Sequence, residues 1–403
     1  MMNVKILPCW LGGMGLIKAK VLQEGAYKEK YSFIGEWYDN QASLVRRFNV
    51  FYYPTDDTIE MYDLKNRKTF LRRVKVNGIT LDNFFIGSSL YILGRLVKII
   101  DFACEHTKEK LHKDMEVTFA LIKPLSSKVT GKIITHFFEH NLKITKMKKA
   151  RLTGDDVNYL YRFQLTDPTF PFLLEHLTGD LVYGMELVGK DAVALSKQII
   201  GDKDPMKAKP GTIRALYGSD PVKNCVDVSS DTETAIQDVE YFFPSPPFHL
   251  SRLRLTATLS NCTLCIVKPH AIREGKLGAA LEAIDEGGFD ITALNMFIVE
   301  NINAAEFYEV YKGIVQEYKG MVEELSSGPC IAMEIVAKDK RTNTAVEFRK
   351  LVGPSDPEIA RLLRPNTMRA KLGKTKVQNA IHCSDLAEDG LLEVEYFFKI
   401  LNL

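Results

Sequence analysis

Two short stretches of the sequence share one frame of polar residues and differ at the position that could act as a nucleophile. KNCVDVSSD (223–231) and VQNAIHCSD (377–385) both follow Asn-x-x-[Asp/His]-x-Ser, with Asp227 in the first and His382 in the second. A neutral imidazole nitrogen can attack near pH 7 without strong activation. Glu393, further along the chain, could bond the other ring nitrogen and fix the tautomer. The second stretch therefore predicts a histidine nucleophile, and the first raises the question of what an aspartate does in its place.

Cationic residues near both stretches indicate chemistry on a polyphosphate. Lys123 and Lys268 each end an apolar run, and Arg214 and Arg369 each precede one of the two frames. Phosphate oxygens need cations from several directions, and arginine supplies a planar fork while lysine supplies a point charge. The sequence lacks GxxxxGK[ST], which excludes a P-loop kinase.

The sequence contains two copies of one domain. Three pairs of segments recur in the same order: TFALIKP (118–124) and TLCIVKP (263–269), PGTIRAL (210–216) and PNTMRAK (365–371), and DVEYFF (238–243) and EVEYFF (393–398). We therefore assign residues 115–243 and 261–403 to two repeats, joined by a linker at 244–260 that is rich in Pro, Ser and Arg. This duplication predicts an intrachain pseudo-dimer, in which the repeats pack on each other as single-domain relatives pack into dimers.

The order of elements predicts an α+β fold. Each repeat opens with a strand and passes through Lys-Pro into a helical pattern and a second strand, as in LGAALEAIDEGGF (277–289) and ITALNMFIVE (291–300). This order favours a sandwich of one antiparallel sheet covered by helices. Residues 31–110 instead show short aromatic and β-branched runs between turn signals, which predicts a small all-β, PH-like domain.

The N-terminal region holds two features with open interpretations. The all-β domain carries a basic cluster, which is either a solvated strand face or a docking surface for an acidic protein. Its members are Lys65, Arg67, Lys68, Arg72, Arg73 and Lys75. Residues 1–30 form a tail whose apolar part is broken by Pro8 and lacks a small-x-small cleavage site, so we expect no signal peptide. The tail either docks on a partner protein or folds back onto its own domain.

Composition excludes several classes of function. A formal charge of +2 over 403 residues provides no global field to attract nucleic acid or membrane, and no stretch is long enough to span a bilayer. Seven cysteines, an odd number, fit a reducing compartment, so we expect a cytoplasmic protein. Cys262 and Cys265 form a CxxC, but positions i and i+3 of a strand face opposite sides and no second pair exists. We therefore expect no metal site.

Both repeats resemble nucleoside diphosphate kinases, and the N-terminal region resembles the DM-ten module of ciliary members of that family. The segments that carry the resemblance are SGPC (327–330), LRPNTMRA (363–370), KTKVQNAIHCSD (374–385) and DGLLEVEYFFKIL (389–401). The resemblance implies two ferredoxin-like domains and a ping-pong reaction. In that reaction a histidine takes the γ-phosphate of ATP and passes it to a nucleoside diphosphate, with Mg²⁺ carried in by the nucleotide.

The resemblance assigns roles to matching positions of the second repeat, with His382 as the phosphorylated residue. The other matches are Lys268, Arg349 and Arg369 for the phosphates, Ser355 for the family's threonine hydroxyl, Asn379 for the sugar, Ser384 and Glu393 beside the histidine, and Tyr311 and Tyr318 for the base. The sequence departs from the family at Cys383, where glycine is usual, and in a shorter spacing from Tyr311 to Ser-Gly-Pro. These departures put the fit of the nucleotide in question.

The first repeat is degenerate by the same comparison. It keeps Lys123, Arg214 and Asn224, but has Lys197 in place of the first phosphate arginine and Asp227 in place of the histidine. An aspartate oxygen has sufficient reach, and aspartyl-phosphates exist in other enzymes. A carboxylate facing a polyphosphate nevertheless adds like charge. We therefore expect a pseudo-enzyme, and leave open whether it binds nucleotide.

Two functions of different classes follow from the resemblance. The first is a structural protein of the ciliary axoneme, located inside doublet microtubules with tubulin and other axonemal proteins as partners. The alternative is an active nucleoside diphosphate kinase. The loss at Asp227 favours the structural role, whereas the survival of Lys268, Arg369, Asn379 and His382 together favours activity.

Overall fold

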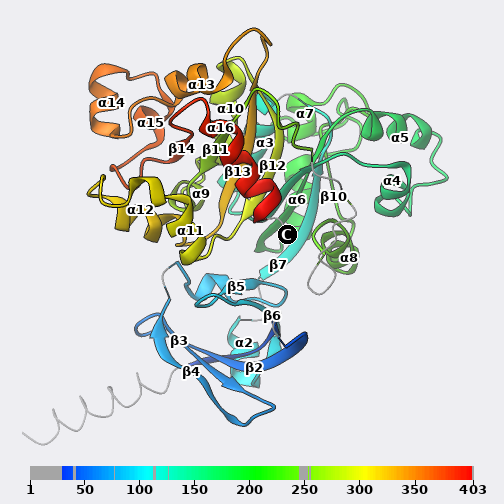
Figure 1. Ribbon diagram of the computed structural model, residues 1–403. Coiled ribbons are helices and arrows are strands. Elements are labelled where there is room, and N and C mark those ends of the chain that lie inside the picture. Colours follow the sequence, from blue (N-terminus) through cyan, green and yellow to red (C-terminus); the bar gives the residue numbers. More distant parts are fainter. Residues whose placement is uncertain are drawn as a thin grey trace, which may run out of the picture. The chain divides into compact units, whose positions relative to one another are not determined.

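The computed structural model divides the chain into two compact units, Met1–Lys113 and Asp114–Leu403 (Figure 1). It describes residues 30–39, 42–76, 78–111, 115–125, 127–244, 253 and 256–401. The predicted N-terminal tail lies almost wholly outside the described residues. No helix in the described ranges has the length and apolar character needed to cross a membrane.

Unit 1 is built on a six-stranded sheet with the strand order β4-β3-β2-β1-β6-β5. Its strands are β1 (Tyr31–Asp39), β2 (Leu44–Tyr53), β3 (Thr58–Asp63), β4 (Lys68–Lys75), β5 (Ser89–Tyr91) and β6 (Leu96–Phe102), with short helices η1 (Leu81–Asn83) and α2 (Glu105–Leu111). Along β3, buried and half-buried residues alternate, as expected where one face of a strand packs on a core. Phe33, Phe48 and Val50 are fully buried in that core. The all-β region predicted from the sequence is confirmed.

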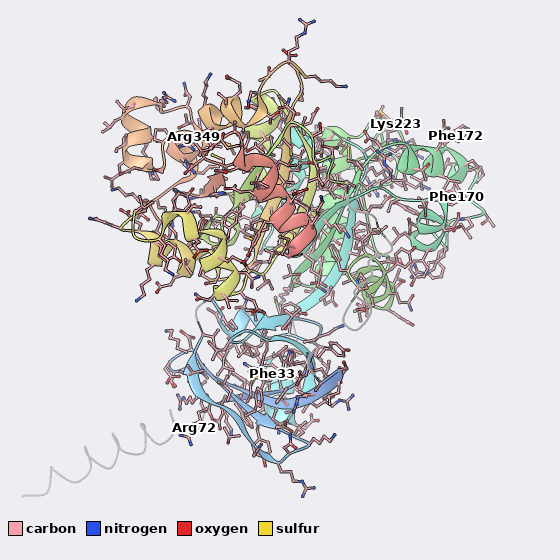
Figure 2. All side chains as sticks on the ribbon, viewed as in Figure 1. Phe33, Arg72, Phe170, Phe172, Lys223 and Arg349 are labelled. Carbon is pink, nitrogen blue, oxygen red and sulfur yellow. The ribbon has the colours of Figure 1, made fainter. Side chains whose placement is uncertain are left out.

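The basic cluster of unit 1 is divided between solvent and internal contacts. Arg72 on β4 is exposed (Figure 2). Arg73 instead donates to Asp56 at 2.7 Å and lies over the ring of Tyr53, 3.9 Å from its centroid. Such aromatic and ionic contacts hold a charged side chain against its own domain. Only part of the cluster is therefore available to a partner.

Unit 2 contains one eight-stranded antiparallel sheet to which each repeat contributes four strands. The first repeat supplies β7 (Met115–Ile122), β8 (Lys143–Ala150), β9 (Val182–Lys190) and β10 (Val226–Val228), and the second supplies β11 (Cys262–Val267), β12 (Phe289–Phe297), β13 (Cys330–Ala337) and β14 (Ile381–Cys383). The strand order is β10-β7-β9-β8-β12-β13-β11-β14. The order within one repeat mirrors that within the other, and β10 and β14 lie at opposite edges.

Helices connect the strands in both repeats, and the second repeat has additional helical elements (Figure 1). In the first repeat they are α3 (Ser127–Glu139), α4 (Gly154–Leu160), α5 (Phe170–Gly179), α6 (Ala192–Ile200), α7 (Ile213–Tyr217) and α8 (Thr232–Phe242). In the second they are α9 (Pro269–Arg273), α10 (Leu277–Glu286), α11 (Asn301–Phe307), η2 (Glu309–Tyr311), α12 (Tyr318–Leu325), α13 (Thr344–Val352), α14 (Pro357–Leu363), α15 (Met368–Leu372), α16 (Asp389–Glu395) and a π-helical turn η3 (Tyr396–Ile400). This confirms the predicted α+β class.

The two repeats meet at the centre of the sheet. Asn295 of β12 pairs with Lys148 of β8, and α3 packs against α10. The helices approach so closely that a Cβ added to Gly278 would lie 2.5 Å from the carbonyl oxygen of Gly131. The hydrophobic core is continuous across this junction, since it includes Ile133 of α3 and Leu281 of α10.

The end of the linker is fastened to the second repeat by a buried carboxylate. Glu334 of β13 is 0% exposed and accepts backbone hydrogen bonds from Thr258 at 2.7 Å and Leu259 at 2.6 Å. Thr292 also donates to the same side chain. A buried carboxylate with several donors is satisfied without a metal or a free cation. The segment 256–260, assigned to the linker from its composition, thus lies against β13.

We predict that Gly278→Ala destabilises unit 2 by about 1–3 kcal/mol, because the new methyl group overpacks the contact between α3 and α10. Urea unfolding followed by circular dichroism would measure the change. Gly154→Ala is the matched control, since a Cβ there meets no atom within 4 Å. Equal unfolding midpoints for the two variants would show that the helices separate readily.

Candidate functional site

His382 lies on the edge strand β14 with its ring held by a carboxylate. The Nε2 atom is 3.0 Å from Glu393 Oε2 on α16, and Ser384 Oγ donates to the same carboxylate oxygen at 2.8 Å. Only 5% of His382 is exposed. An acceptor at Nε2 selects the tautomer with hydrogen on that atom, which leaves the lone pair on Nδ1. The arrangement thus orients one ring nitrogen for attack.

Two aromatic rings at the end of α11 form a wall beside this histidine. The centroid of Phe307 lies 5.1 Å from that of His382, and the centroid of Tyr308 lies 5.8 Å away, both edge-on. Tyr308 is 0% exposed, and its hydroxyl has no hydrogen-bond partner among the described residues. The sequence analysis missed Tyr308. A signal for it was present in the first repeat, where the pair Leu160-Tyr161 stands at the end of α4 as Phe307-Tyr308 stands at the end of α11.

Lys268 and Asn379 present polar groups in the same buried region. Lys268 Nζ donates to the carbonyl oxygen of Val377 at 3.0 Å. Burial lowers the pKa of Lys268 to about 7, and the nearby Arg369 adds to the shift. Asn379 Nδ2 donates to Ser355 O at 3.0 Å, while its Oδ1 is buried without a partner in the described structure. Asn379 Oδ1 has therefore lost water without gaining a hydrogen bond from the described residues.

Arg369 is held rigidly and borders a cleft. Its Nε donates to Ile381 O and its Nη1 to Gly353 O, both at 2.9 Å. The adjoining cleft has a volume of about 480 Å³. Its lining includes Arg349, Arg364, Arg369, Ser355 and Asp385. Three guanidinium groups against one carboxylate make this cleft suited to an anion.

Arg349 lies on α13, as labelled in Figure 2, and its side chain already has an acidic partner. It pairs with Asp385, which also accepts a hydrogen bond from the Tyr311 hydroxyl at 2.7 Å. Tyr318 instead donates to the backbone oxygen of Ala305 at 3.3 Å. Neither tyrosine belongs to the lining of the cleft, so the described structure brings Arg349 to it but not the two residues expected to contact the base.

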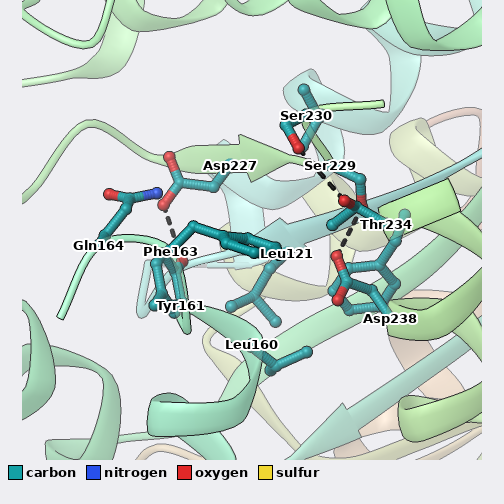
Figure 3. Close-up of a pocket in the computed structure, with 12 residues that line it drawn as sticks. Leu121, Leu160, Tyr161, Phe163, Gln164, Asp227, Ser229, Ser230, Thr234 and Asp238 are labelled. Atoms are coloured by element: carbon teal, nitrogen blue, oxygen red, sulfur yellow. Dashed lines mark hydrogen bonds between the residues drawn. The ribbon is translucent and has the colours of Figure 1, made fainter. Parts of the chain in front are cut away.

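The first repeat surrounds Asp227 with three donors. Asp227 Oδ2 is 3.0 Å from Lys123 Nζ and 2.7 Å from the hydroxyl of Tyr161, and Oδ1 is 2.6 Å from Arg214 Nη2. Figure 3 shows the bond from Tyr161. Burial alone would raise the pKa of Asp227, but Lys123 and Arg214 outweigh it and lower the pKa to about 2. Asp227 is therefore an anion at neutral pH.

The backbone contacts of the cations are the same in both repeats. Lys123 donates to Val222 O at 2.9 Å as Lys268 donates to Val377 O, and Arg214 donates to Val226 O and Gly201 O as Arg369 donates to Ile381 O and Gly353 O. The amide oxygen of Asn224, unlike that of Asn379, accepts a hydrogen bond from the lysine, at 2.6 Å. The lysine and the arginine thus make the same backbone contacts in both repeats, and the two sites differ mainly in the side chains that these cations contact.

Other residues of the first frame are also engaged. Lys197 bonds to the carbonyl oxygen of Ser230. Asp238, at the position of Glu393, accepts hydrogen bonds from Ser229 at 2.7 Å and Arg162 at 2.8 Å. A cavity of about 110 Å³ separates Asp227 from Asp238 and is walled by Leu160, Tyr161 and Phe163, among others (Figure 3). The polar side chains at this site of the first repeat are therefore already hydrogen-bonded within the chain.

The described residues provide no built-in metal site. No group of three or more His, Cys, Asp or Glu side chains among them is arranged to hold a metal ion. Cys262 and Cys265 belong to the hydrophobic clusters on opposite faces of the sheet, as alternation along a strand requires.

Comparisons with known proteins identify the family of the chain. A family model described as nucleoside diphosphate kinase matches residues 116–248 and 261–403. Nucleoside diphosphate kinase homolog 7 of Rattus norvegicus is 44% identical over 93% of this chain and 94% of its own length. Thioredoxin domain-containing protein 6 of Xenopus laevis is 28% identical over 74% of this chain and 45% of its own. A crystal structure of the Aquifex aeolicus nucleoside diphosphate kinase shares 38% identity, covers 35% of this chain and 97% of its own, and has a TM-score of 0.32.

We predict that the stability of unit 2 rises between pH 7 and pH 9 through Lys268. Its pKa is about 7 in the folded chain against 10.5 ordinarily, so the unfolded chain binds more protons in this window. The slope for one such group is at most about 1.4 kcal/mol per pH unit. Urea unfolding of the wild type and of Lys268→Met at both pH values would measure it. The variant should lack this contribution, and identical pH dependence in both proteins would contradict the prediction.

Proposed function

The chain belongs to the nucleoside diphosphate kinase family, and on this basis we propose that its second repeat transfers the γ-phosphate of ATP to nucleoside diphosphates through His382. One observation carries the proposal: buried polar groups around the histidine lack partners. These groups are the Tyr308 hydroxyl and Asn379 Oδ1, and beside them burial without a bonded anion lowers the pKa of Lys268 to about 7. Leaving such groups unsatisfied is costly, and the phosphates and sugar of a nucleotide would satisfy them.

The proposed reaction has two steps that use the same residues. His382 Nδ1 attacks the γ-phosphorus, a nitrogen–phosphorus bond forms, and the bond to the bridging oxygen breaks to release ADP. A terminal oxygen of a nucleoside diphosphate then attacks the phosphohistidine and regenerates the free imidazole. Glu393 holds Nε2–H throughout, and Lys268 and Arg369 stabilise the negative charge on the transferred group. Mg²⁺ bound to the nucleotide's phosphates would neutralise part of their charge.

We propose that the first repeat does not catalyse this reaction. Asp227 replaces the nucleophile with an ionised carboxylate that already bonds Lys123 and Arg214. A carboxylate of low basicity that is held by two cations is a poor nucleophile toward a polyphosphate, because its lone pairs are engaged and the two groups repel.

We predict that incubation with γ-labelled ATP and Mg²⁺ yields an acid-labile, base-stable phosphoenzyme. His382→Ala should abolish the label, because it removes the attacking nitrogen, whereas Asp227→Ala should retain it. Quantified label after gel filtration is the measurement. An acid-stable label, or label that survives in His382→Ala but is lost in Asp227→Ala, would contradict the assignment of the active repeat.

We also propose a structural role on the microtubules of ciliary axonemes, located inside the doublets. The resemblance to ciliary members of the family supports it, as does the loss of the histidine from one repeat. Unit 1 gives further support, because it is an all-β domain that belongs to neither repeat and exposes Arg72 on β4. Exposed basic residues guide association with acidic partners and are screened by salt. Catalysis and scaffolding are compatible in one chain.

We predict that His382→Ala still co-sediments with axonemal microtubules, because scaffolding does not need turnover. Arg72→Glu should weaken co-sedimentation at low salt, since it reverses a charge on the exposed side of β4. Lys312→Glu reverses an exposed charge in unit 2 and is the matched control. The docking role of β4 fails if Arg72→Glu and Lys312→Glu bind equally well. The structural role fails if the wild type does not bind at all.

A further inference from the structure

The first repeat contains a buried pair of cations whose charge is balanced from within the chain. Lys123 is 2% exposed and Arg214 is 7% exposed, and both bond the same carboxylate. Tyr161 adds a third hydrogen bond. The equivalent residues of the second repeat are Lys268, Arg369 and Tyr308, and no acidic side chain bonds any of them in the described structure. The cations of the first repeat therefore share a carboxylate of their own chain, whereas their counterparts in the second repeat bond no carboxylate in the described structure.

We infer that Asp227 is a built-in anion, which occupies the place of a phosphate group in the first repeat and keeps nucleotides out of it. Four elements converge on its side chain: Lys123 follows β7, Tyr161 ends α4, Arg214 lies on α7, and Asp227 itself lies on β10. The inference rests on the proposed function for the identity of the excluded ligand. The ion pairs of Asp227 with Lys123 and Arg214 are observed in the structure and do not depend on the proposed function.

Geometry explains why the carboxylate and a phosphate exclude each other. Arg214 directs Nε and Nη1 to backbone oxygens of Val226 and Gly201. Its Nη2 donates both to Val226 O at 2.9 Å and to Asp227 Oδ1 at 2.6 Å, so the guanidinium has no hydrogen left for a further anion at this nitrogen. Lys123 likewise divides its bonds among Val222, Asn224 and Asp227. A phosphate would have to break these bonds and would then lie beside a half-buried carboxylate. Like charges at such short range strongly disfavour each other.

The inference predicts a nucleotide stoichiometry. Wild-type chain should bind one ADP, at the second repeat. Removing the carboxylate leaves Lys123 and Arg214 buried without a counter-charge, so a phosphate becomes the group that satisfies them. Asp227→Ala should therefore bind two ADP per chain, and ADP should protect the variant against thermal unfolding more than it protects the wild type.

Equilibrium dialysis with labelled ADP and Mg²⁺ on the full chain tests this directly. One site in the wild type and two in Asp227→Ala would support both the inference and nucleotide binding at the second repeat. No site in the wild type and one in the variant would support the inference and sink the proposed function of the second repeat. One site in both proteins, or two in the wild type, would overturn the inference.

A second variant covers the case in which Asp227→Ala does not fold. Asp227→Asn keeps the shape of the side chain and can still accept from Tyr161, but it carries no charge. It should also gain a site, weaker than that of the alanine variant because the amide still fills part of the space. Asp231→Asn, which neutralises an exposed carboxylate on the same segment, is the matched control and should bind as the wild type does. A folded Asp227→Asn with wild-type stoichiometry would overturn the inference.

Discussion

Buried cations need a counter-charge, and this requirement organises both ends of the eight-stranded sheet. Lys123 and Lys268 are each 2% exposed, and each lies beside a buried arginine. Two buried cations that lie close together repel each other and have lost water, and a nearby anion offsets both costs. The first repeat supplies the anion from its own chain. The second supplies none, and burial together with Arg369 lowers the pKa of Lys268 to about 7.

The two cation sites, one with an internal anion and one without, lie at opposite edges of the sheet. β10 and β14 are three-residue strands at opposite edges, and the frame residues Asp227 and His382 sit at their centres. The junction between the repeats lies at β8 and β12, in the middle of the sheet. No side chain of one frame bonds the other frame in the described structure. The two ends can therefore diverge in sequence while the shared core, centred on α3 and α10, stays the same.

Sequence patterns predicted the features that are local or repeated. The duplicated segments around Lys123 and Lys268 predicted two domains of one fold, and strand alternation predicted the opposite facing of Cys262 and Cys265. Contacts between distant helix ends and strands could not be derived in this way. Tyr308 contacts His382 from a helix end 74 positions earlier in the chain (382 − 308), and the signal for it lay in the other repeat, where Tyr161 holds the equivalent place. Tyr311 stays a prediction: the resemblance assigns it to the base, and in the structure its hydroxyl bonds Asp385.

Replacing a histidine with an aspartate at one position does more than remove a nucleophile. It also supplies the charge that the remaining cations require, so the frame can keep Lys123, Arg214 and Asn224 without any ligand. Restoring a histidine alone would not recreate the second site, because Asp238 has a shorter side chain than Glu393 and is also bonded to Arg162, whereas Glu393 bonds Ser384 and His382. The first repeat is thus best understood as a frame that has been rebuilt around an internal charge, rather than as a catalytic site with one part missing.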